Sequence, residues 1–201
     1  MDSKTVKDDR SFLDKLMGSK YFELVGLLCL IIVYSLIVQS RSGKFLSLNN
    51  MGNILKEIVV YGILSCALAF PLLNGTFDLS IESTCALGGT LCGLLVTDGL
   101  YGLKTGMVMA IVISVLLCCI IGVVNGIIVS RTKIDPFIVT LGTQTVVRGV
   151  VYIVSDNTAV TQLPPAFKSL STGTIFGVSV SVWTLIFVFA VMDLVLGKTS
   201  Y

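Results

Sequence analysis

The apolar residues of this chain gather into long runs that are almost free of charge. Three runs contain no charged residue: 24–40, 106–130 and 169–192. A helix needs about 20 mainly apolar residues to cross a bilayer. A membrane β-barrel would instead alternate apolar and polar residues over stretches of about ten, and no such stretch is found. The pattern therefore predicts an all-α, polytopic membrane helix bundle.

The runs predict six transmembrane segments and one domain. The segments are expected at about 21–39, 53–73, 79–98, 106–130, 136–154 and 177–197. Ser47, Asn49 or Asn50 can cap the start of the second. Residues 1–20 mix lysines, an arginine and aspartates, so they are expected to form a cytoplasmic tail ahead of an uncleaved first helix. Residues 21–201 are expected to form the transmembrane domain.

The distribution of lysine and arginine predicts the orientation. Cytoplasmic loops carry an excess of these residues. With the amino terminus inside, Arg131, Lys133 and Lys198 fall on the cytoplasmic side together with the basic tail. Arg41 and Lys44 fall outside and disagree, but they are outnumbered. We expect a multi-pass protein of a bacterial plasma (inner) membrane with its amino terminus in the cytoplasm.

Composition removes several classes of function. Only 13% of the residues are charged and 54% are hydrophobic, whereas about 25% are charged in soluble domains. The chain has no histidine, which excludes a histidine metal site or general base. Its six cysteines lie in apolar segments without a C-x-x-C pair, which favours packing over disulfides or zinc. We expect no metal, no cofactor and no nucleic acid partner.

The stretch "FPLLNGTFDLSIES", residues 70–83, is polar where its surroundings are not. Between positions 59 and 96 the only charged residues are Asp78 and Glu82. Pro71 and the turn pair Asn74-Gly75 predict a break near 71–78. Asp78 and Glu82, four apart, share a face if the third helix has begun, but Asp78 can also cap that helix. Two interpretations fit this stretch. It can be a capping turn, or it can be a discontinuous element that borders a polar path. In the second case Asn74, Asp78, Ser80 and Glu82 are the candidate residues of the path.

A second polar stripe lies in the fifth segment. Thr140, Gln144 and Arg148 are spaced by four residues, with Thr143 beside them, so they lie on one face of a helix. Arg148 follows Pro136 by 12 residues, about 18 Å along a helix. It can serve as a structural anchor, or the stripe can face the break and pair with one of its acids.

These residues resemble the monosaccharide (ribose-type) permeases of ATP-binding-cassette (ABC) transporters. "TFDLSIES" resembles their G-x-D-L-S-x-G-S signature. "NGIIVSRTKIDPFIVTLGTQTVVRGVVYIVS" resembles their N-G-x-x-V…P-F-I-x-T-L-G-T…R-G segment, and "FLSLNNMGNIL" the stretch before their second helix. The resemblance runs from about residue 45 to the last residue. It implies a permease subunit of a sugar importer.

Two departures from the family pattern are evident. Thr76 and Glu82 replace the glycines that flank D-L-S. The chain also ends at "LGKTSY", before the G-R-x-x-x-A-x-G-x-N stretch that the resemblance associates with ATPase docking. We therefore keep a truncated, non-functional permease fragment as an alternative.

The resemblance implies partners that this chain does not supply. They are a separate ATP-hydrolysing subunit, an extracytoplasmic sugar-binding protein, a second permease chain and the bilayer. "GKTS" at 197–200 imitates a phosphate-binding loop, but the first glycine would have to be at position 192, which is Met192. A membrane-embedded enzyme using Asp78 and Glu82 is the other alternative, although no nucleophile, metal cluster or phosphate loop supports it. We expect no enzymatic activity from this chain.

Overall fold

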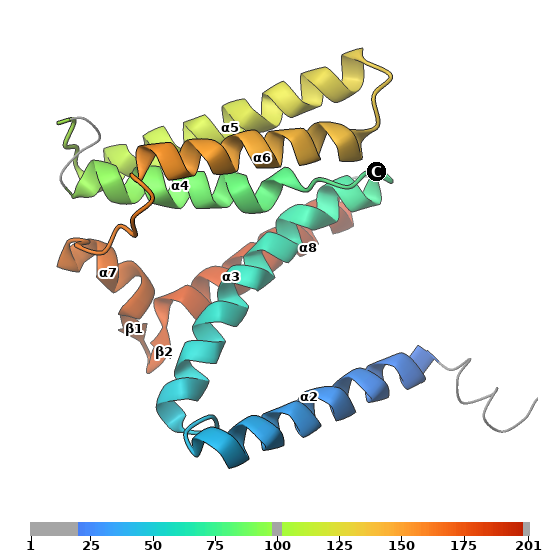
Figure 1. Cartoon of the computed structure of the whole chain (residues 1–201), viewed down its shortest axis with the longest axis vertical. Coiled ribbons are helices and arrows are strands. Elements are labelled where there is room, and N and C mark those ends of the chain that lie inside the picture. The colour runs from blue at the N-terminus through green and yellow to red at the C-terminus, as the bar shows by residue number, and fades with distance from the viewer. Residues whose placement is uncertain (1–19, 98–101, 199–201) are drawn as a thin grey trace, which may run out of the picture. The chain divides into compact units, whose positions relative to one another are not determined.

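The computed structural model describes residues 20–97 and 102–198, and these residues are mainly helical (Figure 1). The chain divides into two units, residues 1–55 and 56–201. The expected cytoplasmic tail, 1–20, lies almost entirely outside the described residues. The helices are α2 (Lys20–Ser42), α3 (Leu48–Leu73), α4 (Ser80–Val96), α5 (Met107–Arg131), α6 (Pro136–Val154), α7 (Pro165–Thr172) and α8 (Val180–Lys198).

The first unit holds α2 and the start of α3, joined by a short turn. Gly43 ends α2 with a φ of 64°, a conformation that glycine adopts without strain. The side chain of Gln39 spans the turn, because its Oε1 accepts from the Leu46 amide (2.8 Å) and its Nε2 donates to the Gly43 carbonyl (3.2 Å). The Ser47 hydroxyl accepts from the Asn50 amide (3.4 Å) and caps α3. The turn is therefore held by its own polar side chains.

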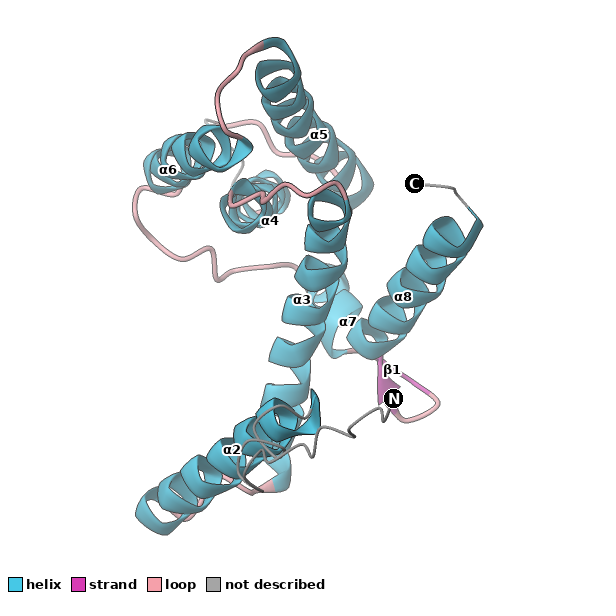
Figure 2. Ribbon diagram, turned by 90° about the vertical axis from the view of Figure 1, so that its right-hand side faces the viewer, coloured by secondary structure: helices cyan, strands magenta, loops and turns pink. Residues whose placement is uncertain are grey.

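The second unit is built around α4, which packs against both α5 and α6 (Figure 2). Two small apolar clusters form this core. One joins the end of α4 to α5 through Leu91, Leu95 and Ala110, and the other joins α4 to α6 through Leu87 and Val147. Most large apolar side chains elsewhere on these helices are exposed. A helix with apolar residues all round suits a lipid environment rather than water.

The remaining elements of the second unit lie around α8. Gly62 in α3 faces α8 so closely that an added Cβ would come within 2.8 Å of Leu185 Cδ1. Between α6 and α8 the chain forms α7 and a hairpin of β1 (Thr174–Ile175) and β2 (Val178–Ser179). Phe176 and Gly177 both have positive φ, 53° and 78°, as a tight hairpin turn requires.

The structure has a helix in each of the six ranges expected from the hydrophobic pattern, and the predicted all-α fold is confirmed. Five of the described helices are long and apolar enough to cross a membrane. The helix expected at 79–98 is shorter than the other five, because α4 has only 17 residues, and it is not among the helices long enough to cross a membrane. The short helix α7 and the hairpin were not predicted. The second helix begins at Leu48 rather than 53, because Ser47 rather than a later residue caps it.

Candidate functional site

The break between α3 and α4 is a tight turn followed by a short extended segment. Pro71 lies inside the last turn of α3, and its carbonyl accepts from the amides of Asn74 (3.0 Å) and Thr76 (2.9 Å). Gly75 takes a φ of 69°, which closes the turn. The helix therefore ends where Pro71 and Asn74-Gly75 predicted, and it does not resume until Ser80.

The end of the break, where α4 begins, lies partway along α5 and α6 and not at the level of the loop that joins them. The Thr140 hydroxyl of α6 donates to the Phe77 carbonyl (3.2 Å). The start of α4 is also linked, through Asn125, to Thr143, which lies seven residues into α6. Seven helical residues correspond to about 10 Å. The amino terminus of α4 therefore lies about 10 Å from the loop that joins α5 and α6, measured along those two helices. Because α4 begins partway along its neighbours, it is shorter than they are.

A chain of buried and half-buried hydrogen bonds holds this helix start. Asp78 Oδ1 accepts from both the amide (2.8 Å) and the hydroxyl (2.7 Å) of Ser80. Ser80 Oγ accepts from Asn125 Nδ2 (2.9 Å), and Asn125 Oδ1 accepts from the Thr143 hydroxyl (2.6 Å). Ser80 and Asn125 are only 3% and 5% exposed. Three helices are therefore joined by side chains whose polar atoms satisfy one another, as buried polar groups require.

Asp78 has the capping role considered from the sequence. It lies one residue before Leu79, the N-cap residue of α4, and its carboxylate accepts from the first helical amide. A carboxylate there also interacts favourably with the positive end of the helix dipole. Asp78 does not share a helical face with Glu82, because the helix begins after it. The two acids have separate partners.

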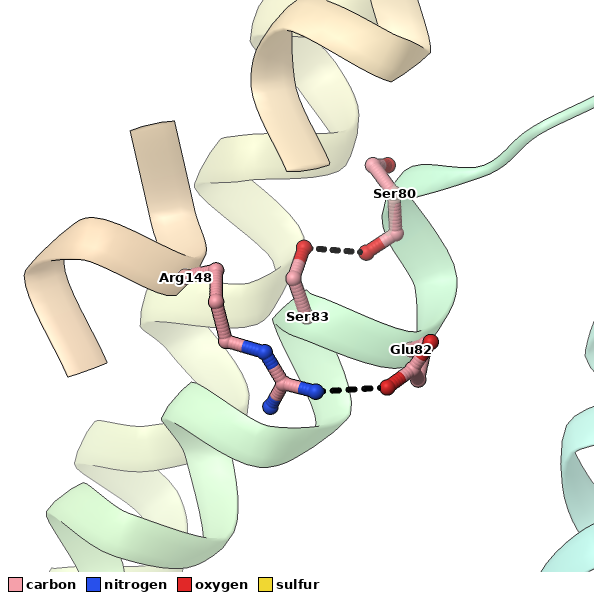
Figure 3. A network of polar contacts seen from close by, with 4 residues as sticks. All are labelled: Ser80, Glu82, Ser83 and Arg148. Atoms are coloured by element: carbon pink, nitrogen blue, oxygen red, sulfur yellow. Dashed lines mark hydrogen bonds and ion pairs between the residues drawn. The ribbon is translucent and has the colours of Figure 1, made fainter. Parts of the chain in front are cut away.

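Glu82 is paired across the helix contact with Arg148 of α6. Arg148 Nη2 lies 2.6 Å from Glu82 Oε1, and Figure 3 shows the guanidinium reaching from α6 to α4. Nearby, the buried Ser83 hydroxyl donates to the Ser80 carbonyl (2.9 Å) and turns back into its own helix. The Arg148 and Glu82 side chains are 41% and 62% exposed. An ion pair thus lies open about 18 Å along a membrane helix.

The structure brings together six of the eight residues singled out in the sequence. Five of them, Asp78, Ser80, Thr143, Glu82 and Arg148, form the hydrogen-bond chain and the ion pair, and Thr140 binds the break through the Phe77 carbonyl. The other two do not join. Asn74 is exposed and donates to the Phe70 carbonyl (3.1 Å). Gln144 is half-buried and has no hydrogen bond within the described part of the chain.

Asn125 is the centre of the hydrogen-bond chain and was not among the residues predicted from the sequence. It lies in the charge-free run of α5 and is the first residue of the stretch that resembles N-G-x-x-V, but it was not predicted to be a site residue. The signal was present, because an amide side chain in a membrane helix requires a hydrogen-bonding partner. The sequence does not show which helix supplies that partner.

Comparison with known proteins places this architecture among transport proteins. Residues 50–201 match the family model described as the branched-chain amino acid transport system / permease component. The chain is 30% identical to the ribose import permease protein of Haemophilus influenzae over 87% of its own length and 53% of that protein. It is 28% identical to the ribose import permease protein of Bacillus subtilis (88% and 53%) and 29% identical to the L-arabinose transport system permease protein of Escherichia coli (79% and 47%).

The expected resemblance to ribose-type permeases is therefore confirmed. The chain spans about half the length of the curated relatives it matches. No solved structure matches it significantly.

Proposed function

Because the chain belongs to the permease family described as the branched-chain amino acid transport system permease component, we propose that it forms part of the substrate path of a bacterial ABC sugar importer. The sugar class rests on the similarity to proteins named as ribose and L-arabinose permeases. The ATP-hydrolysing subunit, the extracytoplasmic sugar-binding protein and a second permease chain belong to the same proposal. The proposal also includes a cytoplasmic amino terminus, with a tail at residues 1–20 and a transmembrane domain at residues 21–201.

The Glu82–Arg148 pair is the observation that carries this proposal. The hydrocarbon core of a bilayer is about 30 Å thick, and the pair lies about 18 Å along α6. Both side chains remain substantially exposed on the described chain. Facing hydrocarbon would cost several kcal/mol, so charged groups at this depth usually face a polar cavity. We assign this side of α4 and α6 to the substrate path.

The hydrogen-bond chain has a different role in this proposal. Asp78, Ser80, Asn125 and Thr143 fix the start of α4 in the interior of the bundle. A helix that starts inside the bilayer presents the positive end of its dipole and free amides at that depth, as in discontinuous transporter helices. The buried chain thus supports the wall of the path, and Glu82 and Arg148 face it.

A membrane enzyme using paired carboxylates is less well supported. Paired acid–base catalysis needs two carboxyl groups directed at one reacting group. Here Asp78 bonds to Ser80 while Glu82 bonds to Arg148. The relatives are named as transport permeases.

Sugar uptake tests the proposal directly. The chain is expressed with the ATPase and binding protein of a ribose importer in cells that lack pentose uptake, and entry of labelled D-ribose is measured. We expect Glu82→Gln, Arg148→Gln and the double variant to reduce uptake while the amount of chain in the membrane is unchanged. Lys168→Gln, a charge removal in α7, serves as the control. Uptake by the double variant equal to that of the unmodified chain would remove the pair from the path.

A further inference from the structure

A polar hollow lies at the far end of the α4–α6 pair, away from the loop that joins α5 to α6. Its volume is about 410 Å³, within the range of about 300–1,000 Å³ that is usual for small-molecule sites. The lining residues of α4 are Gly89 and Thr90, those of α6 are Val151 and Tyr152, and the rest follow α6: Ser155, Asn157, Thr158, Ala159 and Val160.

The chain after α6 is bent sharply to form one wall of this hollow. Asp156 and Asn157 both take left-handed conformations, with φ of 49° and 52°. Aspartate and asparagine tolerate this region better than most residues. The backbone amide of Asn157 donates to the Tyr152 carbonyl (2.9 Å). The chain then lies against α4 at Gly93, where an added Cβ would be 3.1 Å from Val160 Cγ1. The wall is held in place by this close packing.

The lining offers hydrogen bonds but no charge. None of the lining residues is an aspartate, glutamate, lysine, arginine or histidine. Four of them, Thr90, Tyr152, Ser155 and Asn157, have side chains with no hydrogen-bond partner within residues 20–97 and 102–198. Together they present three hydroxyl groups, one amide and an aromatic ring. A zwitterionic amino acid would leave its charges without opposite charges here, whereas an uncharged polyhydroxyl compound matches these donors and acceptors.

The hollow continues the face that carries the ion pair. Gly89 follows Glu82 by seven residues on α4, and Tyr152 follows Arg148 by four on α6. These spacings keep residues on one side of a helix. Four residues correspond to about 6 Å and seven to about 10 Å, so the hollow begins about one to two turns beyond the ion pair.

We propose that this hollow is a binding subsite for a neutral monosaccharide of pentose size at the mouth of the path. The proposal rests on the proposed transport function, since the shared face connects the hollow to the Glu82–Arg148 pair. With the amino terminus in the cytoplasm, the hollow lies on the outer side, where a sugar-binding protein would release its cargo. The unpartnered polar side chains then exchange water for sugar hydroxyl groups.

Sugar binding to the purified chain tests the subsite without transport. The full chain in lipid nanodiscs is probed with D-ribose, L-arabinose and L-leucine by saturation-transfer NMR. We expect transfer to both sugars and none to leucine. Gly89→Leu should abolish it, because the space around Gly89 is open and a leucine there fills the hollow. Gly126→Leu is the matched control, since Gly126 in α5 is equally open and lies outside the hollow.

Asn157→Gly provides a second test that leaves the hollow empty. It removes the side-chain amide of an exposed residue, and glycine adopts the left-handed conformation of this position without strain, so the variant should weaken the transfer to sugars while changing the thermal stability of the chain little. An absence of sugar transfer in the unmodified chain, or full transfer in Gly89→Leu, overturns the subsite. Failure of ribose uptake by the assembled importer overturns the transport function instead, so the two failures are distinguishable.

Discussion

At the scale of single residues, the polar side chains of the second unit separate into a buried set and an exposed set. Asn125 is the central buried residue, because it donates to Ser80 and accepts from Thr143. Glu82 and Arg148 are the exposed pair. The two sets lie within one turn of each other at the start of α4, yet their burial differs greatly. Substitutions in the buried set should therefore affect stability, and those in the exposed set should affect transport.

Replacement of Asn125 by alanine is expected to destabilise the chain. It removes two hydrogen bonds and leaves Ser80 and Thr143 with fewer partners. A hydrogen bond contributes about 0.5–1.5 kcal/mol in proteins, with similar values between membrane helices. The free energy of unfolding, measured by detergent titration, should fall by about 1–2 kcal/mol. Asn74→Ala, at an exposed position, is the control and should change it by less than about 0.5 kcal/mol.

Replacement of Asp78 by asparagine separates charge from hydrogen bonding. In the unmodified chain the backbone amide and the hydroxyl of Ser80 both donate to one carboxylate oxygen of Asp78. The side-chain oxygen of an asparagine at this position can still accept both hydrogen bonds. Loss of the charge near the helix end should cost only about 0.3–1 kcal/mol. We expect ribose uptake to fall more than stability does, because Asp78 is only half-buried and its charge lies next to the wall that Glu82 and Arg148 line. Equal uptake by Asp78→Asn and the unmodified chain would limit Asp78 to capping.

At the scale of helices and loops, the main features of the fold were predictable from short patterns. Charge-free runs gave the helices, and Pro71 with Asn74-Gly75 gave the end of α3. The sequence could not give the depth at which α4 begins, because that depends on which residues of α5 and α6 lie beside Ser80. For the same reason Asn125 escaped notice, whereas the charge of Arg148 suggested an acidic partner. The hairpin is too short to show a periodic pattern.

The interaction energy between Glu82 of α4 and Arg148 of α6 should show whether the ion pair faces water or hydrocarbon. Glu82→Gln, Arg148→Gln and the double variant form a mutant cycle whose interaction energy is obtained from free energies of unfolding. A pair beside water should show a coupling below about 1 kcal/mol. A pair enclosed in hydrocarbon would leave one charge uncompensated in each single variant, at a cost of about 3–5 kcal/mol. We expect the smaller value, and a large one would contradict the path.

At the scale of the whole molecule, three features follow one another along the α4–α6 pair. The basic residues Arg131 and Lys133 lie at the loop before α6, the Glu82–Arg148 pair lies farther along, and the polar hollow lies at the end. This order gives the molecule a direction across the membrane. Because basic loops remain in the cytoplasm, the hollow should open to the outside. The direction of the path therefore depends on the side on which Lys133 lies.

Labelling of single cysteines with a thiol reagent tests on which side of the membrane Lys133 lies. The six native cysteines are first replaced, and one cysteine is then placed at Lys133, between α5 and α6, or at Lys168 in α7. A membrane-impermeant thiol reagent added to intact cells should label position 168 and spare position 133, because α6 crosses the bilayer between them. Both positions should react after the cells are opened, which controls for folding. Labelling of position 133 alone in intact cells would reverse the orientation, and equal labelling of both would contradict the passage of α6 across the membrane.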